Sequence, residues 1–314
     1  MIFYALFPKV FRASASLYNF TLFPAFKKVA EHFDIEYMPF EIDGDWADGN
    51  EVIEKLPSIE DEVIFITTYN NGWTREHYDS IKSKMPNAKM VWLGSDTHYD
   101  GKTESGSLVG LENIQWPLDL YLDTMKDVVT EASSLFPSEH YYWSISESII
   151  DLIDSFDLNT AKKYDSICLC STDNGSSVRK EMFQALDEAG LWVLRNLNEH
   201  NLETILNFYS QSWTALGTTT PCMNSDLRSM KGFRDWIAPF CGTVLIYDNF
   251  PDILDIGSFV PIYKYEDWDD AARVIKELKT NSYVYDLIIK KQKQWALENT
   301  LEKQLIRIFK KHLL

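Results

Sequence analysis

The 314-residue sequence contains no apolar run that approaches the roughly 20 residues a membrane-spanning helix needs. It also lacks a basic segment followed by a short apolar stretch and a small-residue cleavage site, the pattern typical of secretion signals. We therefore expect no stable membrane insertion. The expected compartment is the cytoplasm, or the host cytoplasm for a protein of viral origin.

Cysteine is scarce, and its spacing indicates no cross-link. Cys168, Cys170, Cys222 and Cys241 lie in or beside apolar runs, and no two of them form a C-x-x-C pair. Zinc sites and disulfide frameworks rest on paired spacings of that kind. The sequence therefore predicts reduced, mostly buried thiols.

Positive charge is scarce in one half of the chain only. Residues 1–157 hold 11 Lys and Arg against 27 Asp and Glu, a net charge of −16, whereas residues 158–314 hold 19 against 20. A region with that charge repels phosphate backbones at long range. The first half could grip nucleic acid only through a local basic groove, for which Lys82, Lys84 and Lys89 are the candidates.

Apolar residues are abundant enough for two folded domains. Hydrophobic residues make up 45% of the chain and aromatic residues 14%, and the length favours two domains of ordinary size. Short apolar strands alternate with segments of helical periodicity, which predicts parallel sheets wound by crossover helices. The polar segment 154–163 is interpreted as the linker between them. The expected strands are 2–6, 35–40, 62–67, 88–94, 166–170, 191–194, 214–216 and 243–247, and the expected helices are 17–33, 74–85, 176–190, 202–210, 268–279 and 282–314.

Two polar loops of the second half are candidate phosphate sites, because open α/β sheets bind ligands beyond the carboxyl ends of their strands. The loop after the strand 166–170 is rich in small residues, whose backbone N–H groups can approach a phosphate at the start of a helix. An ordinary N-capped turn has the same composition. The residues concerned are Ser171, Thr172, Asn174, Gly175 and Ser176.

The second of these loops, 218–234, carries Arg228, Lys231 and Arg234. Three cations ahead of a helix can neutralise a diphosphate, and arginine suits bidentate contact with phosphate oxygens. A solvated face with ion pairs to nearby acids is the alternative.

Three loops of the first half also follow expected strands. Asp96 and His98 follow the strand 88–94, Arg12 and Ser14 follow the first strand, and Trp73 follows the third. A carboxylate at such a place can act as a general base, and an aromatic ring can stack on a sugar or base. The alternatives are an Asx turn, a solvated histidine, a charged rim and a core tryptophan.

The stretch R-D-W-I-A-P-F-C-G resembles part of the donor-site motif of GT-B glycosyltransferases, R-x-F-E-x-x-x-x-G. Arg234 matches the arginine, Trp236 the aromatic residue and Gly242 the glycine. Where the family has a glutamate that accepts hydrogen bonds from the donor's ribose, this chain has Ile237, which accepts none. Pro239 is expected to delay the start of the helix. The resemblance is to the group 1, spore-coat-maturation type and to phage enzymes that glucosylate hydroxymethylcytosine in DNA; it is close over the C-terminal half and loose over the N-terminal half.

The resemblance implies the GT-B fold: α/β, with two doubly wound, Rossmann-like domains facing a cleft. Residues 1–157 would form the acceptor-side domain and residues 158–289 the donor domain. The C-terminal helices would cross back to the first domain, from about residue 290 to 314. The terminal helix is amphipathic and basic, so a position on an anionic membrane surface is the alternative.

The implied activity is transfer of a hexose or pentose from a nucleotide sugar, expected to be UDP-linked, to an acceptor hydroxyl. The two polar loops and Arg234 would hold the diphosphate, Trp236 would pack behind Arg234, and Asp96 would be the base if the transfer inverts configuration. If it retains configuration, the donor's own phosphate would assist. No cofactor and no metal are expected, since GT-B enzymes do not require a carboxylate-bound metal. The alternatives are a phage-type enzyme acting on hydroxymethylated bases in DNA, a non-catalytic relative and a nucleotide-sugar epimerase.

Overall fold

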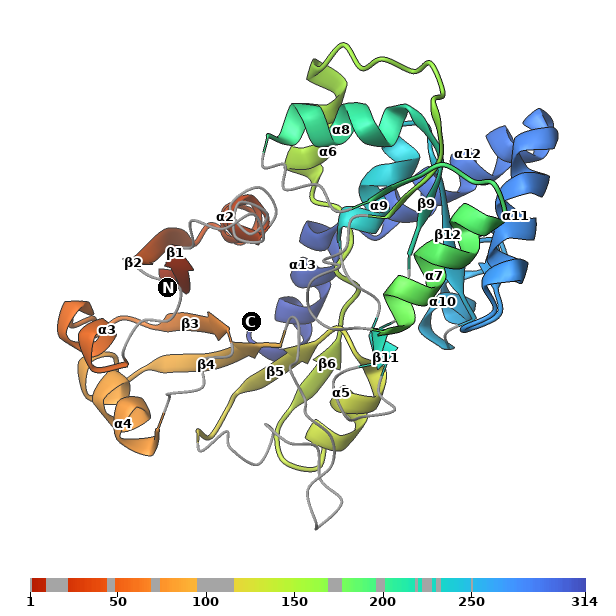
Figure 1. Ribbon diagram of the computed structural model, residues 1–314. Coiled ribbons are helices and arrows are strands. Elements are labelled where there is room, and N and C mark those ends of the chain that lie inside the picture. The colour runs from red at the N-terminus through yellow and green to blue at the C-terminus, as the bar shows by residue number, and fades with distance from the viewer. Residues whose placement is uncertain are drawn as a thin grey trace. The chain divides into compact units, whose positions relative to one another are not determined.

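The computed structural model describes residues 2–9, 22–43, 49–68, 74–94, 116–168, 177–195, 201–217, 220–221, 228–229, 233–249 and 251–314. The chain divides into two compact units (Figure 1). Unit 1 comprises Met1–Tyr142, Thr220–Ser229 and Leu301–Leu314, and unit 2 comprises Trp143–Thr219 and Met230–Thr300. Each unit has its own parallel sheet.

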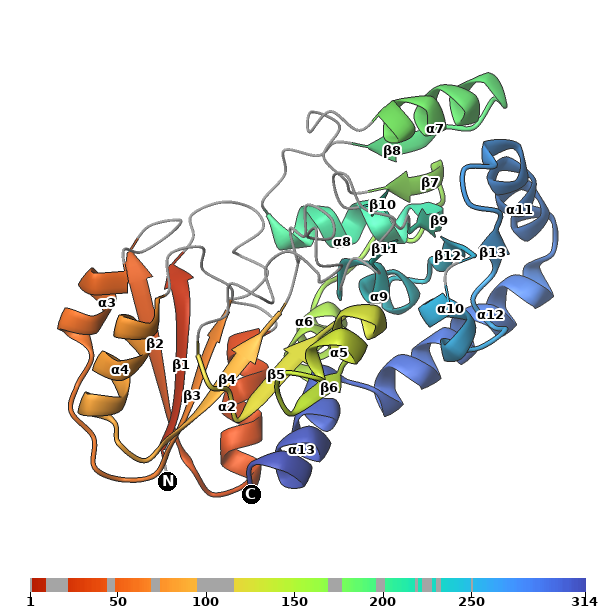
Figure 2. The same cartoon turned by 90° about the horizontal axis from the view of Figure 1, so that it is seen from below.

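The sheet of unit 1 has the strand order β2-β1-β3-β4-β5-β6, and every neighbouring pair is parallel (Figure 2). The connections reverse direction between β1 and β3, which makes that pair the switch point of a doubly wound sheet. The central strands are almost wholly apolar, as expected where helices cover both faces. The strands are β1 (Ile2–Lys9), β2 (Glu36–Asp43), β3 (Val63–Thr68), β4 (Ala88–Leu93), β5 (Leu120–Asp123) and β6 (Ser138–His140).

Helices pack on this sheet to close its core. The apolar residues of α3 (Gly49–Lys55), α4 (Arg75–Lys84) and α5 (Lys126–Ala132) join one buried cluster with alternate residues of β3, β4 and β5. Elsewhere in unit 1, α2 (Leu22–His32) packs against the C-terminal α13 (Leu301–His312), as both ribbon views show (Figures 1 and 2). The last helix therefore belongs to the N-terminal unit.

The sheet of unit 2 has the order β13-β12-β9-β7-β8 and is also parallel throughout. Its switch point lies between β7 and β9. One core cluster joins the sheet to α7 (Ser177–Glu188) and α11 (Trp268–Thr280), whereas α8 (Leu202–Ser210), α9 (Phe233–Phe240) and α12 (Ser282–Glu298) contact β9 or β12. The strands are β7 (Tyr164–Cys168), β8 (Val193–Arg195), β9 (Ser212–Leu216), β12 (Val244–Asp248) and β13 (Ile262–Tyr263). The helices α6 (Glu147–Ser155) and α10 (Pro251–Ile256) also belong to unit 2. Two short strands, β10 (Thr220–Pro221) and β11 (Arg228–Ser229), form an antiparallel pair that belongs to unit 1.

Two buried glutamines attach the C-terminal helices to the sheet edges. Gln292 of α12 accepts a hydrogen bond from Leu245 N (3.0 Å) and donates one to Leu245 O (2.7 Å). Two residues further along β12, Tyr247 N donates to Pro261 O, immediately before β13. The side-chain amide of Gln292 therefore substitutes for a strand neighbour where β13 has not yet begun.

Gln304 of α13 makes the same double contact in unit 1. Its Oε1 accepts from Tyr142 N (2.8 Å) and its Nε2 donates to Tyr142 O (3.0 Å), just after the edge strand β6. Lys311 and His312 of α13 add contacts to Glu139, which lies in β6. Four apolar residues of α13, Leu301, Leu305, Ile308 and Phe309, are buried, so the alternative position of this helix on a membrane surface is wrong.

The α/β class with two doubly wound sheets, predicted from the alternation of strands and helices, is confirmed. The helix expected at 202–210 has those bounds, and most other elements begin or end within two or three residues of the expectation. The strand expected at 35–40 is longer than predicted, because β2 continues to Asp43. Cys168 and Cys241 are buried free thiols, as predicted, and Cys170 and Cys222 lie outside the described residues. Among the helices of the described ranges, none is long and apolar enough to cross a membrane.

Candidate functional site

The parallel strands of each unit all end at one edge of their sheet. The sequence-predicted loops follow those ends: after β1, β3 and β4 in unit 1, and after β7 and β9 in unit 2. They include the loops on both sides of each switch point, where doubly wound sheets bind their ligands. Chain order alone therefore places the candidates at the binding edge of their own sheet.

Most of the candidate side chains themselves lie outside the described residues. For two of them the backbone is described: Arg228 pairs with Pro221 in the β10–β11 ladder, and Arg234 lies in the first turn of α9. The candidates outside the described ranges are Arg12, Ser14, Trp73, Asp96, His98, Ser171, Thr172, Asn174, Gly175, Ser176 and Lys231.

Trp236 is a fully buried residue of α9. Its ring stacks on Trp295 of α12, with centroids 4.2 Å apart and planes at 26°. Stacked aromatic pairs of this kind contribute about 0.5–1.5 kcal/mol beyond the area they bury. Its Nε1 has no hydrogen-bond partner in the part of the chain that the structure describes. Trp236 therefore fixes α9, and with it the backbone of Arg234, on α12.

Ile237 is 1% exposed and lies among buried residues of α9. A carboxylate at this helix position would lose its hydration in the core of unit 2, which is costly without a partner. Pro239 does not delay the helix, contrary to expectation: α9 begins at Phe233 and the proline lies in its last turn. The helix ends one residue later, so the missing N–H costs little of the ladder.

The described edge of unit 2 is closed by aromatic residues. Gly217, just after β9, lies beside Tyr247 of β12, and a Cβ at Gly217 would come within 2.0 Å of the Tyr247 ring. The hydroxyl of Tyr263 donates to Gly217 O (3.0 Å). Asp248, which ends β12, is 1% exposed. A glycine is therefore needed after β9 because a ring occupies the space a side chain would fill.

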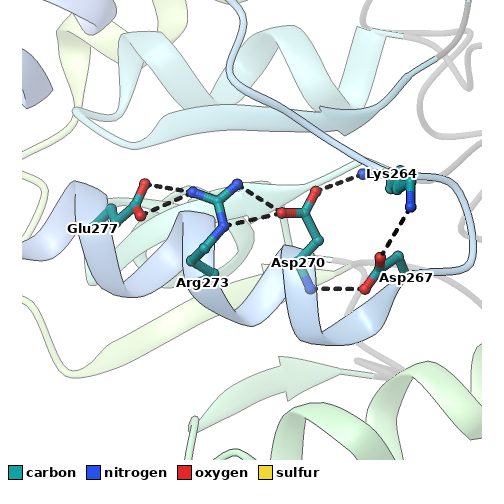
Figure 3. Close-up of polar contacts among 5 residues, drawn as sticks. All are labelled: Lys264, Asp267, Asp270, Arg273 and Glu277. Carbon is teal, nitrogen blue, oxygen red and sulfur yellow. Dashed lines mark hydrogen bonds and ion pairs between the residues drawn. The ribbon is translucent and has the colours of Figure 1, made fainter.

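A chain of exposed ion pairs fixes the turn between β13 and α11 (Figure 3). Asp267 caps the helix by accepting from Asp270 N, and Asp270 in turn accepts from Lys264 N and from Arg273. The Arg273 guanidinium, followed by the Lys264 N–H, lowers the pKa of Asp270. Because Arg273 also pairs with Glu277 in solvent, the chain shapes the turn and contributes modestly to stability.

Asp123 is a candidate that the sequence analysis missed. It ends β5, is fully buried, and lies beside Gly94, the residue after β4. Burial raises the pKa of Asp123 to about 7, against hydrogen bonds from Tyr121 and two backbone N–H groups that lower it. Perturbed carboxyl groups at the ligand edge of a sheet are typical of functional sites. The sequence signal for such a site was an aspartate directly after an apolar run, here L-Y-L. Asp248 likewise follows an apolar run, V-L-I-Y.

The three lysines considered for a basic groove all bond to backbone carbonyls of unit 1. Lys82 Nζ donates to Ala88 O (2.8 Å), Lys84 Nζ to Leu56 O (2.8 Å) and Lys89 Nζ to Leu313 O. Their ammonium groups therefore stabilise unit 1 by hydrogen-bonding backbone carbonyls. Within the described ranges, no group of three or more His, Cys, Asp or Glu side chains is placed to hold a metal ion.

No protein-family model and no curated protein sequence matches the chain. Solved structures do. A DNA-modifying β-glucosyltransferase, studied with and without its substrate uridine diphosphoglucose, is similar over 99% of both chains with a TM-score of 0.57 and 15% identity. The chain has the GT-B fold.

Further proteins with the GT-B fold match over similar lengths. An E. coli trehalose-6-phosphate protein bound with UDP-2-fluoro glucose matches over 99% of this chain and 98% of its own, with a TM-score of 0.67 and 10% identity. An α-glucosyltransferase in complex with UDP and a 13-mer DNA containing an HMU base matches over 99% and 98%, with a TM-score of 0.55 and 12% identity. At such identities the likeness shows the GT-B fold alone, with its two parallel sheets and a C-terminal helix on the N-terminal unit.

Proposed function

We propose that the protein is a glycosyltransferase that moves a sugar from a UDP-linked donor to an acceptor hydroxyl. The observation that carries the proposal is the full-length GT-B likeness to structures that hold UDP, UDP-glucose or a UDP-glucose analogue. It is supported by the polar and cationic loops at the carboxyl edge of unit 2, a location suited to binding a nucleotide diphosphate. No metal takes part in the proposed reaction.

Unit 2 is proposed to hold the donor. Backbone N–H groups of the loop that contains Gly175 would contact the diphosphate, together with the side chains of Arg228, Lys231 and Arg234. The stack of Trp236 on Trp295 would hold α9 in place beneath this cluster. Because Ile237 is buried, the ribose hydroxyls would be bound by residues other than the one at the family's glutamate position.

Unit 1 is proposed to supply the acceptor side. Asp96 would take the proton of the acceptor hydroxyl if the configuration of the sugar is inverted. With retention, the donor phosphate would take that role. Arg12, Ser14, Trp73 and His98 follow β1, β3 and β4 and would line the acceptor or assist at the donor phosphate.

Donor turnover by the purified protein tests this proposal. UDP release would be measured with UDP-, GDP- and ADP-sugars, each with and without simple glycoside acceptors, for the wild type, Arg234→Ala and the control Arg273→Ala. Arg273 is an exposed arginine of the same unit. We expect release from UDP-sugars by the wild type and the control, and little by Arg234→Ala. Absence of release from every donor, at a protein concentration that saturates the assay, contradicts the proposal.

A second candidate is transfer to hydroxymethylated bases in DNA. It is favoured by the likeness to two DNA-associated glucosyltransferases over nearly the whole chain. The net charge of −16 on residues 1–157 and the carbonyl-bound lysines count against it. A gel shift with duplex DNA at increasing salt decides: DNA transfer requires binding that weakens steeply with salt.

The turnover assay, together with a nucleotide-binding titration, also distinguishes a transferase from an epimerase and from a non-catalytic protein of the same fold. A nucleotide-sugar epimerase would change the donor sugar without any acceptor, which product analysis detects. A non-catalytic relative would bind a nucleotide and release no sugar from it.

A further inference from the structure

The end of β5 carries a carboxyl group in an unusual place. β4 and β5 pair in register, with Trp92 opposite Tyr121 and Leu93 opposite Leu122. One step further, Gly94 faces Asp123. The side chain of Asp123 is fully buried at this point, on the same face of the sheet as the Tyr121 ring.

Asp123 is held by its own strand and by the start of the next helix. Its Oδ2 accepts from the Tyr121 hydroxyl (2.8 Å), and its Oδ1 accepts from Met125 N (2.9 Å). The Thr124 N–H is a third donor. With three donors the carboxylate has a defined position, in contrast to an exposed acid that samples several rotamers.

Gly94 leaves room for that carboxylate and no more. A Cβ on Gly94 would lie 2.1 Å from Asp123 Oδ2 and 3.0 Å from the Tyr121 hydroxyl oxygen. The backbone of Gly94 is fixed as well, since its N–H donates to Leu122 O (2.6 Å) and its carbonyl accepts from the Tyr141 hydroxyl (3.2 Å). The point where the chain leaves β4 is therefore set by Asp123 and two tyrosines.

The geometry points to Asp123, with Tyr121 and Gly94, as a positioning group that sets where the chain departs from β4. Asp96, the proposed base, stands two residues beyond Gly94 in the sequence. The catalytic consequence rests on the proposed function: because only one residue separates Gly94 from Asp96 in the sequence, a fixed Gly94 limits the positions open to the proposed base. Asp123 acts through this backbone and is not itself a catalytic residue.

This arrangement makes the exit from β4 sensitive to pH. The pKa of Asp123 is raised by burial to about 7, so its charge changes near neutrality. Because burial penalises the ionised carboxylate more than its hydrogen bonds stabilise it, the closed arrangement around Asp123 becomes less stable as the pH rises through 7. Of the titratable residues near it on described elements, Tyr121 on β5 bonds the carboxyl directly, and Tyr141 bonds Gly94 O through its hydroxyl and Asp123 O through its backbone N–H. His140 on β6 contacts Thr124 O (3.1 Å), and Lys126 begins α5 three residues after Asp123.

Hydrogen exchange at Gly94 and the residues after it tests the positioning role without any substrate. Exchange would be followed at pH 6 and pH 8, corrected for the intrinsic rate, in the wild type, Asp123→Asn and Asp127→Asn. Asp127 is an exposed acid four residues further on and serves as the matched control. We expect at least threefold lower protection at pH 8 than at pH 6 in the wild type and the control, because ionisation of the buried carboxyl favours local opening, and equal protection in Asp123→Asn. The same pH response in all three proteins overturns the role.

A rate profile tests the consequence for catalysis. In the wild type, kcat for donor turnover should fall as the pH rises through 7, and in Asp123→Asn this decline should disappear while KM for the donor stays within twofold. An unchanged profile overturns the link to Asp96. If no protein turns over any donor, the proposed function fails, and the exchange experiment still decides the positioning role.

Discussion

The replacement of Gln292 by alanine tests how α12 holds the sheet of unit 2. Gln292 is fully buried, and its amide satisfies both backbone groups of Leu245 at 3.0 and 2.7 Å. Truncation leaves a buried N–H and a buried C=O without these partners. Each orphaned group costs about 1–3 kcal/mol, so the free energy of unfolding should fall by about 2–6 kcal/mol.

Gln294 provides the matched control on the same helix. Its side chain is exposed and donates to Glu298 (3.0 Å) in solvent. Urea denaturation followed by circular dichroism would compare Gln292→Ala, Gln294→Ala and Gln292→Glu. A glutamate at 292 can accept from Leu245 N and cannot donate to Leu245 O when ionised, so it should be less stable at pH 8 than at pH 5. Equal stabilities of the two alanine variants would refute the strand-substitute role of Gln292.

Three further predictions concern stability. The pKa of Asp123 is about 7 in the folded chain against an ordinary 3.8, so the contribution of this carboxyl to the free energy of unfolding is fully present below pH 3.8 and is lost as the pH rises through 7. In urea denaturation, Asp123→Asn should be as stable as the wild type at pH 4 and more stable by up to about 4 kcal/mol at pH 8. A stability difference that does not change with pH contradicts this. Gly217→Ala forces a Cβ against the buried Tyr247 ring and should lose about 1–3 kcal/mol in the same assay. Arg273→Ala removes only exposed ion pairs and should shift the denaturation midpoint far less than Gly217→Ala; an equal shift would show that the chain in Figure 3 is structural in its own right.

The regular elements could be predicted because their sequences carry local signals. The strand and helix periods are clean in the second half, where Asn201 caps α8 and Gly190, with a positive φ of 74°, follows α7. The segment 116–155 gave no such signal. β5 has only four residues, all buried, and ends in an aspartate, a residue depleted in strands.

The roles of single residues depend on tertiary contacts that the sequence does not display. Gln292 and Gln304 resemble ordinary polar residues of amphipathic helices, and their burial follows only from the sheet edges they meet. Asp123 was missed for the same reason: its perturbed pKa comes from burial opposite Gly94. The expected delay of the helix start at Pro239 was wrong. Proline is favoured in the first turn of a helix, but α9 has only eight residues and Pro239 lies in its last turn.

Calorimetric titration with UDP and UDP-glucose tests whether unit 2 binds a UDP-linked donor through Arg234. The wild type, Arg234→Ala and the control Arg273→Ala would be titrated under the same conditions. We expect saturable binding by the wild type and the control, and affinity about tenfold or more weaker for Arg234→Ala, since a hydrogen bond to a charged group contributes about 1.5–3 kcal/mol. No heat of binding with either ligand, or equal affinity in all three proteins, would contradict this expectation.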